Sequence, residues 1–249
     1  RIRRRVRWRP LWRRRIRRKL VNTRHHIARK LKVNMNKLLN IPEIQKSKWP
    51  SLLQETFGEN LVSAFLHGNC LMEGFDALQS PWTVSFILKD NSPETIARTR
   101  DLMKQAHKEN IQFCYFFSPA EIVKSLDTFP LEYLHIANKS VALCGIQPLA
   151  GFVPEQAKLR LQCERELRGI LVHLREDFVN TKFGKPLQKM FASALNEALP
   201  VLYGVYFLET RTYPENHNQV FDRYPELKQE NLIEAIEKIV IKVDSMEEK

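Results

Sequence analysis

The sequence lacks a long hydrophobic run, a close pair of cysteines and, over its first 30 residues, any acidic residue. No apolar stretch approaches the roughly 20 residues that span a bilayer. The N-terminus also lacks the apolar stretch, roughly 7 to 15 residues long, of a secretory signal. We therefore expect an intracellular, cytoplasmic protein without a transmembrane segment. Organelle targeting by the arginine-rich N-terminus is the alternative that this composition leaves open.

The cysteines are scattered along the chain, with no C-x-x-C pair and no metal-ligand spacing to the histidines. They are Cys70, Cys114, Cys144 and Cys163. We interpret them as reduced thiols. The sequence therefore indicates no metal site, and we expect no cofactor, with Mg²⁺ as the exception if the chain is an enzyme after all.

The basic charge is concentrated in residues 1–30. This arm holds 15 of the 40 Lys and Arg residues, which leaves 25 basic against 28 acidic residues in 31–249, a net charge of −3. The arm is low in complexity and repels itself, so we expect it to be disordered alone in water. After Pro10, the apolar residues Trp12, Ile16 and Leu20 recur every four residues, and a polyanion would favour a basic amphipathic helix there.

The composition of the arm favours binding to nucleic acid, RNA rather than DNA. Arginine pairs with phosphates and tryptophan stacks on bases. The residues that we expect to make these contacts are Arg7, Trp8, Arg9, Trp12, Arg13, Arg14, Arg15, Arg17 and Arg18. An anionic membrane surface, organelle targeting, and a segment that is not part of the working protein are the alternatives.

Residues 31–148 show the pattern of a small α/β domain. Short apolar runs predict buried strands at 60–68, 82–90 and 111–117, and one or two further extended segments over 129–145. Helices are predicted in pieces over 38–53, across 91–110, and over 118–126. The last two open with Ser-Pro, which is an N-cap serine followed by proline at the first helical position.

Residues 149–249 predict an all-α bundle, separated from the first domain by the proline-rich and glycine-containing stretch 146–156. Long amphipathic helices are expected over 155–179, 186–209 and 230–245. In the first of these, apolar residues are spaced by three and four, at Leu159, Cys163, Leu167, Ile170, Leu174 and Phe178. The fold class that we predict is therefore a small mixed sheet with flanking helices, followed by a helical bundle.

The order of elements, the turn "FLHGN" at 65–69 and the spacing to "SPWTVSFIL" at 80–88 resemble the nucleotidyltransferase superfamily, the kanamycin nucleotidyltransferase and DNA polymerase beta-like fold. In that family a strand ends in Gly-Ser or Gly-Gly at a helix N-terminus, and the next strand begins Asp-x-Asp. The resemblance implies that Gly68 and Asn69 bind the phosphates of a nucleotide. It also implies a helical bundle after the catalytic domain.

The second part of the family motif is missing here. Two aspartates at alternate strand positions would hold two divalent metals. The alignment puts Pro81 and Thr83 at these positions, and neither residue is a good metal ligand. We interpret His67, next to the glycine, as a local hydrogen-bonding residue. The sequence thus predicts a fold that has lost its metal site.

Three hypotheses follow. The first is a non-catalytic regulatory module that binds a nucleotide or RNA. Docking on a protein partner is a further possibility within this hypothesis. The alternative is an active nucleotidyltransferase that transfers a nucleoside monophosphate from a triphosphate, with Mg²⁺ held by Glu73, Asp76 or Glu132. A second alternative is a nucleic-acid-associated structural protein that is anchored by its basic arm.

Overall fold

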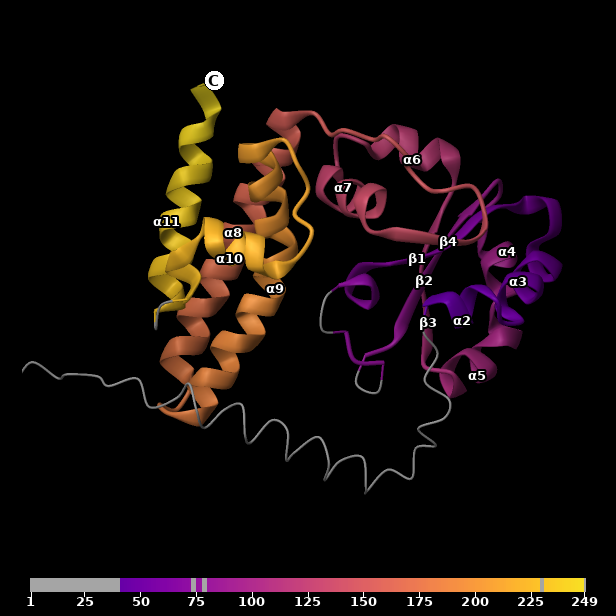
Figure 1. The fold of residues 1–249 in the computed structure, drawn as a ribbon, viewed down its shortest axis with the longest axis horizontal. Coiled ribbons are helices and arrows are strands. Elements are labelled where there is room, and N and C mark those ends of the chain that lie inside the picture. Colours follow the sequence, from indigo (N-terminus) through magenta and orange to yellow (C-terminus); the bar gives the residue numbers. More distant parts are fainter. Residues whose placement is uncertain (1–40, 73–74, 78–79, 229–230, 249) are drawn as a thin grey trace, which may run out of the picture. The chain divides into compact units, whose positions relative to one another are not determined.

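The computed structural model describes residues 41–72, 75–77, 80–228 and 231–248. These form a mixed four-stranded sheet in the order β3-β2-β1-β4 (Figure 1). The strands are β1 (Leu61–His67), β2 (Trp82–Leu88), β3 (Ile111–Phe117) and β4 (Ser140–Gly145). β1 pairs antiparallel with β2 and with β4, whereas β2 and β3 are parallel. The predicted strands at 60–68, 82–90 and 111–117 are confirmed.

Helices cover both faces of the sheet, because successive side chains of a strand point to opposite faces. One face packs against α2 (Ile41–Gln45), α3 (Trp49–Phe57) and α5 (Arg100–Lys108). The other face packs against α6 (Pro119–Ser125) and α7 (Pro130–Asn138). In β1, for example, Leu66 belongs to the first apolar cluster and Phe65 to the second. The prediction of a small sheet with flanking helices is confirmed.

The Ser-Pro devices act as N-caps, as predicted. The Ser92 side chain accepts a hydrogen bond from the Thr95 N–H and starts α4 (Pro93–Ala97). Ser118 and Glu121 form a reciprocal capping box at the start of α6. The single helix expected over 91–110 is instead two helices, α4 and α5. Thr99 lies between them, and its hydroxyl donates to the carbonyl of Ile96.

The extended segments expected over 129–145 are wrong in their first half, because residues 130–138 form α7 before β4 begins. Pro130 is at the first turn of this helix, where its missing N–H costs nothing. α7 is apolar on two sides: Leu131 and Leu134 belong to the bundle core, and Tyr133 and Ile136 belong to the core under the sheet. A helix buried on two sides shows no clean 3.6-residue period, so its sequence resembles a buried strand.

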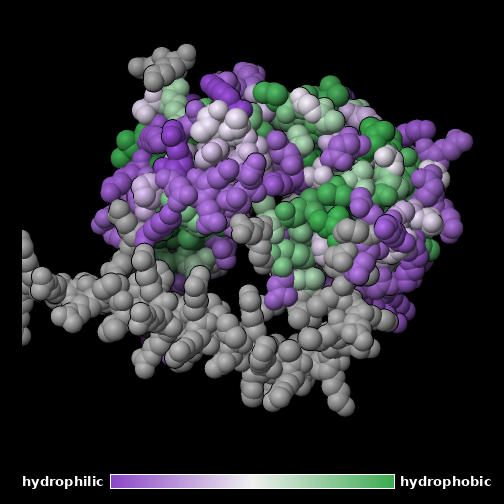
Figure 2. Space-filling model, viewed as in Figure 1, coloured by the Kyte–Doolittle hydropathy of each residue, from purple (hydrophilic) through white to green (hydrophobic). Residues whose placement is uncertain are grey.

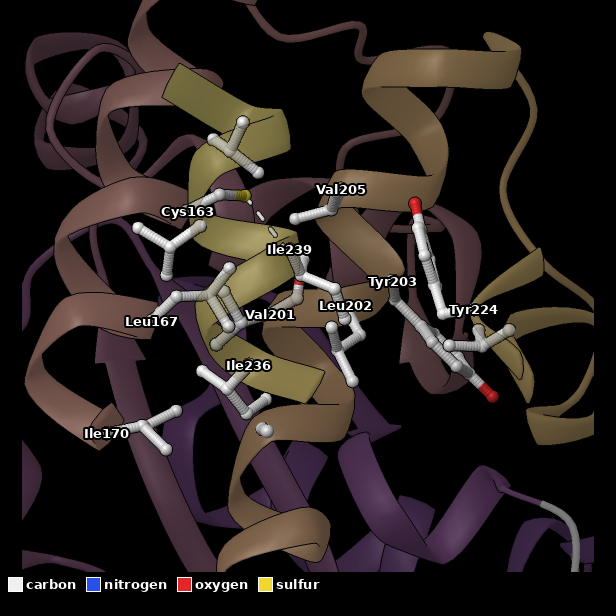
Figure 3. Close-up of a cluster of buried hydrophobic side chains, with 14 of the residues drawn as sticks. Cys163, Leu167, Ile170, Val201, Leu202, Tyr203, Val205, Tyr224, Ile236 and Ile239 are labelled. Carbon is white, nitrogen blue, oxygen red and sulfur yellow. Dashed lines mark hydrogen bonds between the residues drawn. The ribbon is translucent and has the colours of Figure 1, made fainter. Parts of the chain in front are cut away.

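The C-terminal region is helical, as predicted, and comprises α8 (Gln156–Asn180), α9 (Lys185–Thr210), α10 (His217–Arg223) and α11 (Leu232–Asp244). Short 3₁₀ turns occur at η2 (Gly58–Asn60), η3 (Gly68–Leu71), η4 (Pro225–Lys228) and η5 (Ser245–Glu248). The apolar core of the bundle is drawn from α8, α9, α10 and α11 (Figure 3). Of the predicted stripe, Leu159, Cys163, Leu167, Ile170 and Leu174 are buried, and Phe178 is half-buried.

Among the described residues, α9 alone is long and apolar enough to cross a membrane by length and composition. Half of its most apolar window is buried inside the protein, and the core helix of a soluble protein passes the same test. The expectation that the chain has no transmembrane segment is thus compatible with α9, which supplies buried residues such as Leu202 and Val205 to the bundle core. The arm at 1–30, with its predicted disorder and helix, lies outside the described residues. The domain boundaries at 30/31 and 148/149 stay predictions.

A close backbone contact inside the sheet gives a test of this fold. Gly145 has φ +79°, and a Cβ there would collide with the carbonyl oxygen of Val62. Gly151 has φ +76°, but a Cβ there would meet no described atom within 4 Å. We expect Gly145→Ala to lower the free energy of unfolding by about 3 kcal/mol, because overpacking adds to backbone strain. The matched control Gly151→Ala should cost about 1 kcal/mol. Urea denaturation measures both, and equal losses would contradict this packing of β1 against β4.

Candidate functional site

The candidate site lies where β1 ends and β2 begins. We call it the strand mouth, and it comprises His67, Gly68, Asn69, Thr83, Ser85 and Tyr115. The antiparallel register sets Leu66 opposite Val84, so the end of β1 lies beside the start of β2. This is the meeting of strand end and strand start that the sequence predicted.

The turn after β1 is present but short. Gly68 has φ +74°, which favours glycine, and a Cβ there would meet no described atom within 4 Å. Asn69 is exposed. However, these residues begin the four-residue 3₁₀ turn η3 and not an α-helix. Few aligned peptide dipoles therefore support an anion at Gly68, and the roles of Gly68 and Asn69 in binding phosphates stay predictions.

Pro81 and Thr83 do not lie side by side as the two aspartates of the family motif would. The strand ladder begins at Trp82, whose N–H donates to the carbonyl of Asn110. Thr83 lies inside β2, whereas Pro81 precedes the strand and lines a hollow beside α5 and β3. Within β2, the residue two positions after Thr83 on the same face is Ser85.

A buried hydrogen bond joins the two strands at the mouth. His67 Nε2 and Ser85 Oγ are 2.7 Å apart, and both residues are buried. Ser85 Oγ also accepts a hydrogen bond from the backbone N–H of Tyr115 at 3.0 Å. At this point the register of β2 and β3 shifts, which is a β-bulge. The bulge places the Tyr115 ring over His67, with ring centroids 5.3 Å apart and nearly parallel planes.

The strand mouth is electrically neutral at pH 7. Burial lowers the pKa of His67 to about 4, so its imidazole carries no charge. Burial raises the pKa of Tyr115, and the neighbouring Cys114 and Glu132 charges raise it further. Tyr115 nevertheless keeps 41% of its surface exposed. The mouth therefore presents an accessible aromatic ring above an uncharged histidine, and not a pair of carboxylates.

The three acids proposed as metal ligands have different positions. Glu73 lies outside the described residues. Asp76 lies in the segment between η3 and β2, where its carbonyl accepts the N–H of Ser80. Glu132 lies in the first turn of α7 and accepts a hydrogen bond from Gln162 Nε2 at 2.8 Å. Gln162 is buried and also accepts the Leu131 N–H, so it fixes the start of α7 on α8.

The described residues do not fit a two-metal centre. They contain no group of three His, Cys, Asp or Glu side chains close enough to hold a metal ion. Of the two aligned positions, Pro81 and Thr83, only Thr83 has a side-chain oxygen, and the oxygen of Ser85 on the same strand face already bonds His67 and Tyr115. Divalent ions in transfer enzymes require carboxylate oxygens.

Sequence reasoning recognised His67 as a local hydrogen-bonding residue but missed Tyr115 and Gln162. The partner of His67 is 18 residues away and Tyr115 is 48 residues away, and the bulge that joins them has no short sequence signature. The one sequence pattern that pointed to this site was the pair of hydroxyl residues Thr83 and Ser85, which alternate on one face of the strand. The predicted nucleic-acid contacts of the arm, from Arg7 to Arg18, lie outside the described residues.

Comparison with known proteins gives a likeness to solved structures. No protein-family model matches the chain, and a search of curated proteins found no match. A solved structure of a nucleotidyltransferase-like protein from Exiguobacterium sibiricum 255-15 is similar over 82% of this chain and 74% of that one. The two chains are 12% identical, with a TM-score of 0.30. At that level of similarity we take nothing about chemistry from the match.

The buried His67 predicts a pH dependence of stability. Its pKa of about 4 in the folded chain is below the 6.5 of an exposed histidine, so the unfolded chain takes up a proton first. The contribution of His67 to stability should therefore be complete above pH 6.5 and fall as the pH drops towards 4, by about 3 kcal/mol for this residue alone. Urea midpoints between pH 4.5 and 7.5 measure this.

Two variants separate the contributions of His67 and His135 to this pH dependence of stability. Burial also lowers the pKa of His135 to about 4, so His67→Gln and His135→Gln should each remove about half of the histidine contribution. A His67→Gln protein with the full pH dependence of the parent would show that His67 is solvated and that the mouth is not closed over it.

Proposed function

We propose that this chain is a nucleotidyltransferase-like protein that binds nucleotide or RNA without carrying out metal-dependent transfer. The observation that supports it best is the neutral pair His67 and Ser85, hydrogen-bonded beneath Tyr115 and next to Thr83, the position in β2 where the alignment puts one of the two carboxylates of the family motif. The side chains of the strand mouth itself carry no fixed negative charge, whereas two carboxylates without their metals would repel a phosphate.

Tyr115 is the residue that we assign to ligand contact. Its ring is partly exposed and is held in place from below by His67 and from the side by Phe117, at a centroid distance of 5.3 Å. A fixed aromatic face stacks on a base at little cost in side-chain entropy. Gly68 and Asn69 lie at the end of the strand that carries His67, and they are the residues that we assign to the phosphates.

An active enzyme remains the competing function. It requires that Asp76 and Glu132, with Glu73 from outside the described residues, converge on one site. Glu132 is engaged with Gln162 and lies on a helix that packs against the bundle, which favours a structural role for this carboxylate. The two functions make opposite predictions about Mg²⁺.

Calorimetric titration of the full chain with ATP, GTP, CTP and UTP, each with and without Mg²⁺, separates them. We expect binding with the same dissociation constant in both conditions. Tyr115→Ala should weaken it by about tenfold, since a lost base stack is worth about 1 to 3 kcal/mol. Phe183→Ala, at an aromatic residue of the bundle that is 80% exposed, is the matched control and should bind like the parent.

Three outcomes would contradict the proposal. They are binding that requires Mg²⁺, nucleotide transfer to an acceptor that is lost in Glu132→Gln, and nucleotide binding that is equal in the parent and in Tyr115→Ala.

The basic arm supports a second interaction, with nucleic acid. It holds 15 Lys and Arg residues and no acid, so binding to single-stranded RNA should release counterions and weaken steeply with salt. We expect deletion of residues 1–30 to lower RNA affinity at least about a hundredfold and to flatten its salt dependence. Anisotropy with labelled RNA at several salt concentrations measures both. Equal affinity of the deleted chain would exclude the arm.

A further inference from the structure

The two edge strands of the described sheet, β4 and β3, differ in how many of their backbone carbonyls accept hydrogen bonds from side chains. On β4, side-chain amides occupy backbone carbonyls: Gln45 Nε2 donates to Ala142 at 3.1 Å, and Gln147 Nε2 donates to Ser140 at 3.2 Å. Side chains that engage an edge in this way hinder the addition of another strand. On β3, Asn91 Nδ2 caps the carbonyl of Phe116 near the end of the strand. Addition of another strand is therefore least hindered along the first half of β3.

The backbone groups of Ile111 and Phe113 point away from the sheet. β2 and β3 are parallel, with Trp82 opposite Ile111 and Val84 opposite Phe113. The Trp82 N–H donates to Asn110, so the bonds from β2 run to the residues on either side of Ile111 and Phe113. The N–H and C=O of these two residues therefore face the side of β3 on which no described strand pairs.

A hollow of about 440 Å³ lies along this edge. Its lining comes from β3 and from α5, with Pro81 beside them: Pro81, Met103, His107, Asn110, Ile111, Gln112 and Phe113. Met103 and His107 are one helical turn apart and face the strand. An exposed strand edge next to a helix is the arrangement that takes up an extended peptide, since the backbone pairs with the strand and a side chain enters the hollow. On the face shown in Figure 2, hydrophobic surface gathers over the α/β part, whereas hydrophilic side chains cover much of the bundle.

The charged side chains of α5 indicate which kind of peptide segment would bind along β3. Arg100 lies one turn before Met103 on the same helical face, and Lys104 and Lys108 are exposed on the same helix, against a single acid in the helix, the exposed Asp101. Glu109, at the end of the helix, is already paired with Lys48 at 2.8 Å. A second copy of the chain that paired through β3 about a twofold axis would set two such basic helices on the same face, where like charges repel. The wall instead complements acidic side chains.

We propose that β3 and α5 form a docking groove for an extended acidic segment of a partner protein. The segment adds a strand at Ile111–Phe113 and places an apolar side chain in the hollow, with its acidic side chains towards Arg100 and His107. This interaction is separate from nucleotide binding at the strand mouth, because the groove lies on the α5 side of the sheet.

Labelled peptides test the proposal on the full chain. The probe is a blocked seven-residue peptide of alternating glutamate and valine, and the control is the same peptide with lysine in place of glutamate. By fluorescence anisotropy, the glutamate peptide should bind about tenfold more tightly than the lysine peptide. His107→Glu should weaken it by about tenfold. Lys124→Glu, at an exposed residue of α6, should leave it unchanged.

Hydrogen exchange distinguishes strand addition from loose charge attraction. Bound glutamate peptide should slow exchange at the amides of Ile111 and Phe113. Equal binding of the two peptides, unaltered exchange at these amides, or equal affinity of His107→Glu would overturn the proposal. So would a dimer, seen by ultracentrifugation, or binding of single-stranded RNA that His107→Glu abolishes.

Discussion

The hydrogen bond between His67 and Ser85 is the interaction on which the strand mouth depends. It joins β1 to β2 in a buried position, and the same serine oxygen accepts the Tyr115 N–H of β3. Three strands are thus tied through one side-chain oxygen. A buried hydroxyl or imidazole without partners would cost about 1 to 3 kcal/mol, so the network holds its members in one geometry. That geometry holds the Tyr115 ring above His67, whose burial lowers its pKa and keeps it neutral.

The same network constrains what the fold does chemically. A carboxylate at the position of Ser85 would be buried beside His67 and the apolar ring of Phe65, and a buried charge is costly unless it is paired. The described floor of the strand mouth is therefore a neutral hydrogen-bonded pair and not a pair of carboxylates. Rigid aromatic surfaces suit recognition of a planar ligand, because little side-chain entropy is lost on binding. Our proposal of nucleotide or RNA binding rests on this aromatic surface.

Most of the fold was predictable from local patterns, because apolar runs and Ser-Pro caps act over a few residues. The strand at 60–68 and the cap at Ser92 are examples. The prediction failed at α7, where apolar residues face two cores at once and hide the helical period. Within the site, the turn at Gly68 could be predicted from the glycine that follows the apolar run. The contact of Tyr115 with His67 was not, since it depends on a bulge that the chain forms only when β2 and β3 pair.

The bulge also links the strand mouth to the proposed groove. It displaces β3 at Cys114 and Tyr115, so the regular edge ends at Phe113 and an added strand has only Ile111 and Phe113 to pair with before the register breaks. Such a short ladder supplies few backbone hydrogen bonds, each worth about 1 kcal/mol net. Backbone pairing also carries no information about side chains. Affinity and selectivity in the groove must therefore come from the hollow beside Met103 and from the charge of α5, which is why an acidic segment with one apolar anchor is the partner that this edge fits.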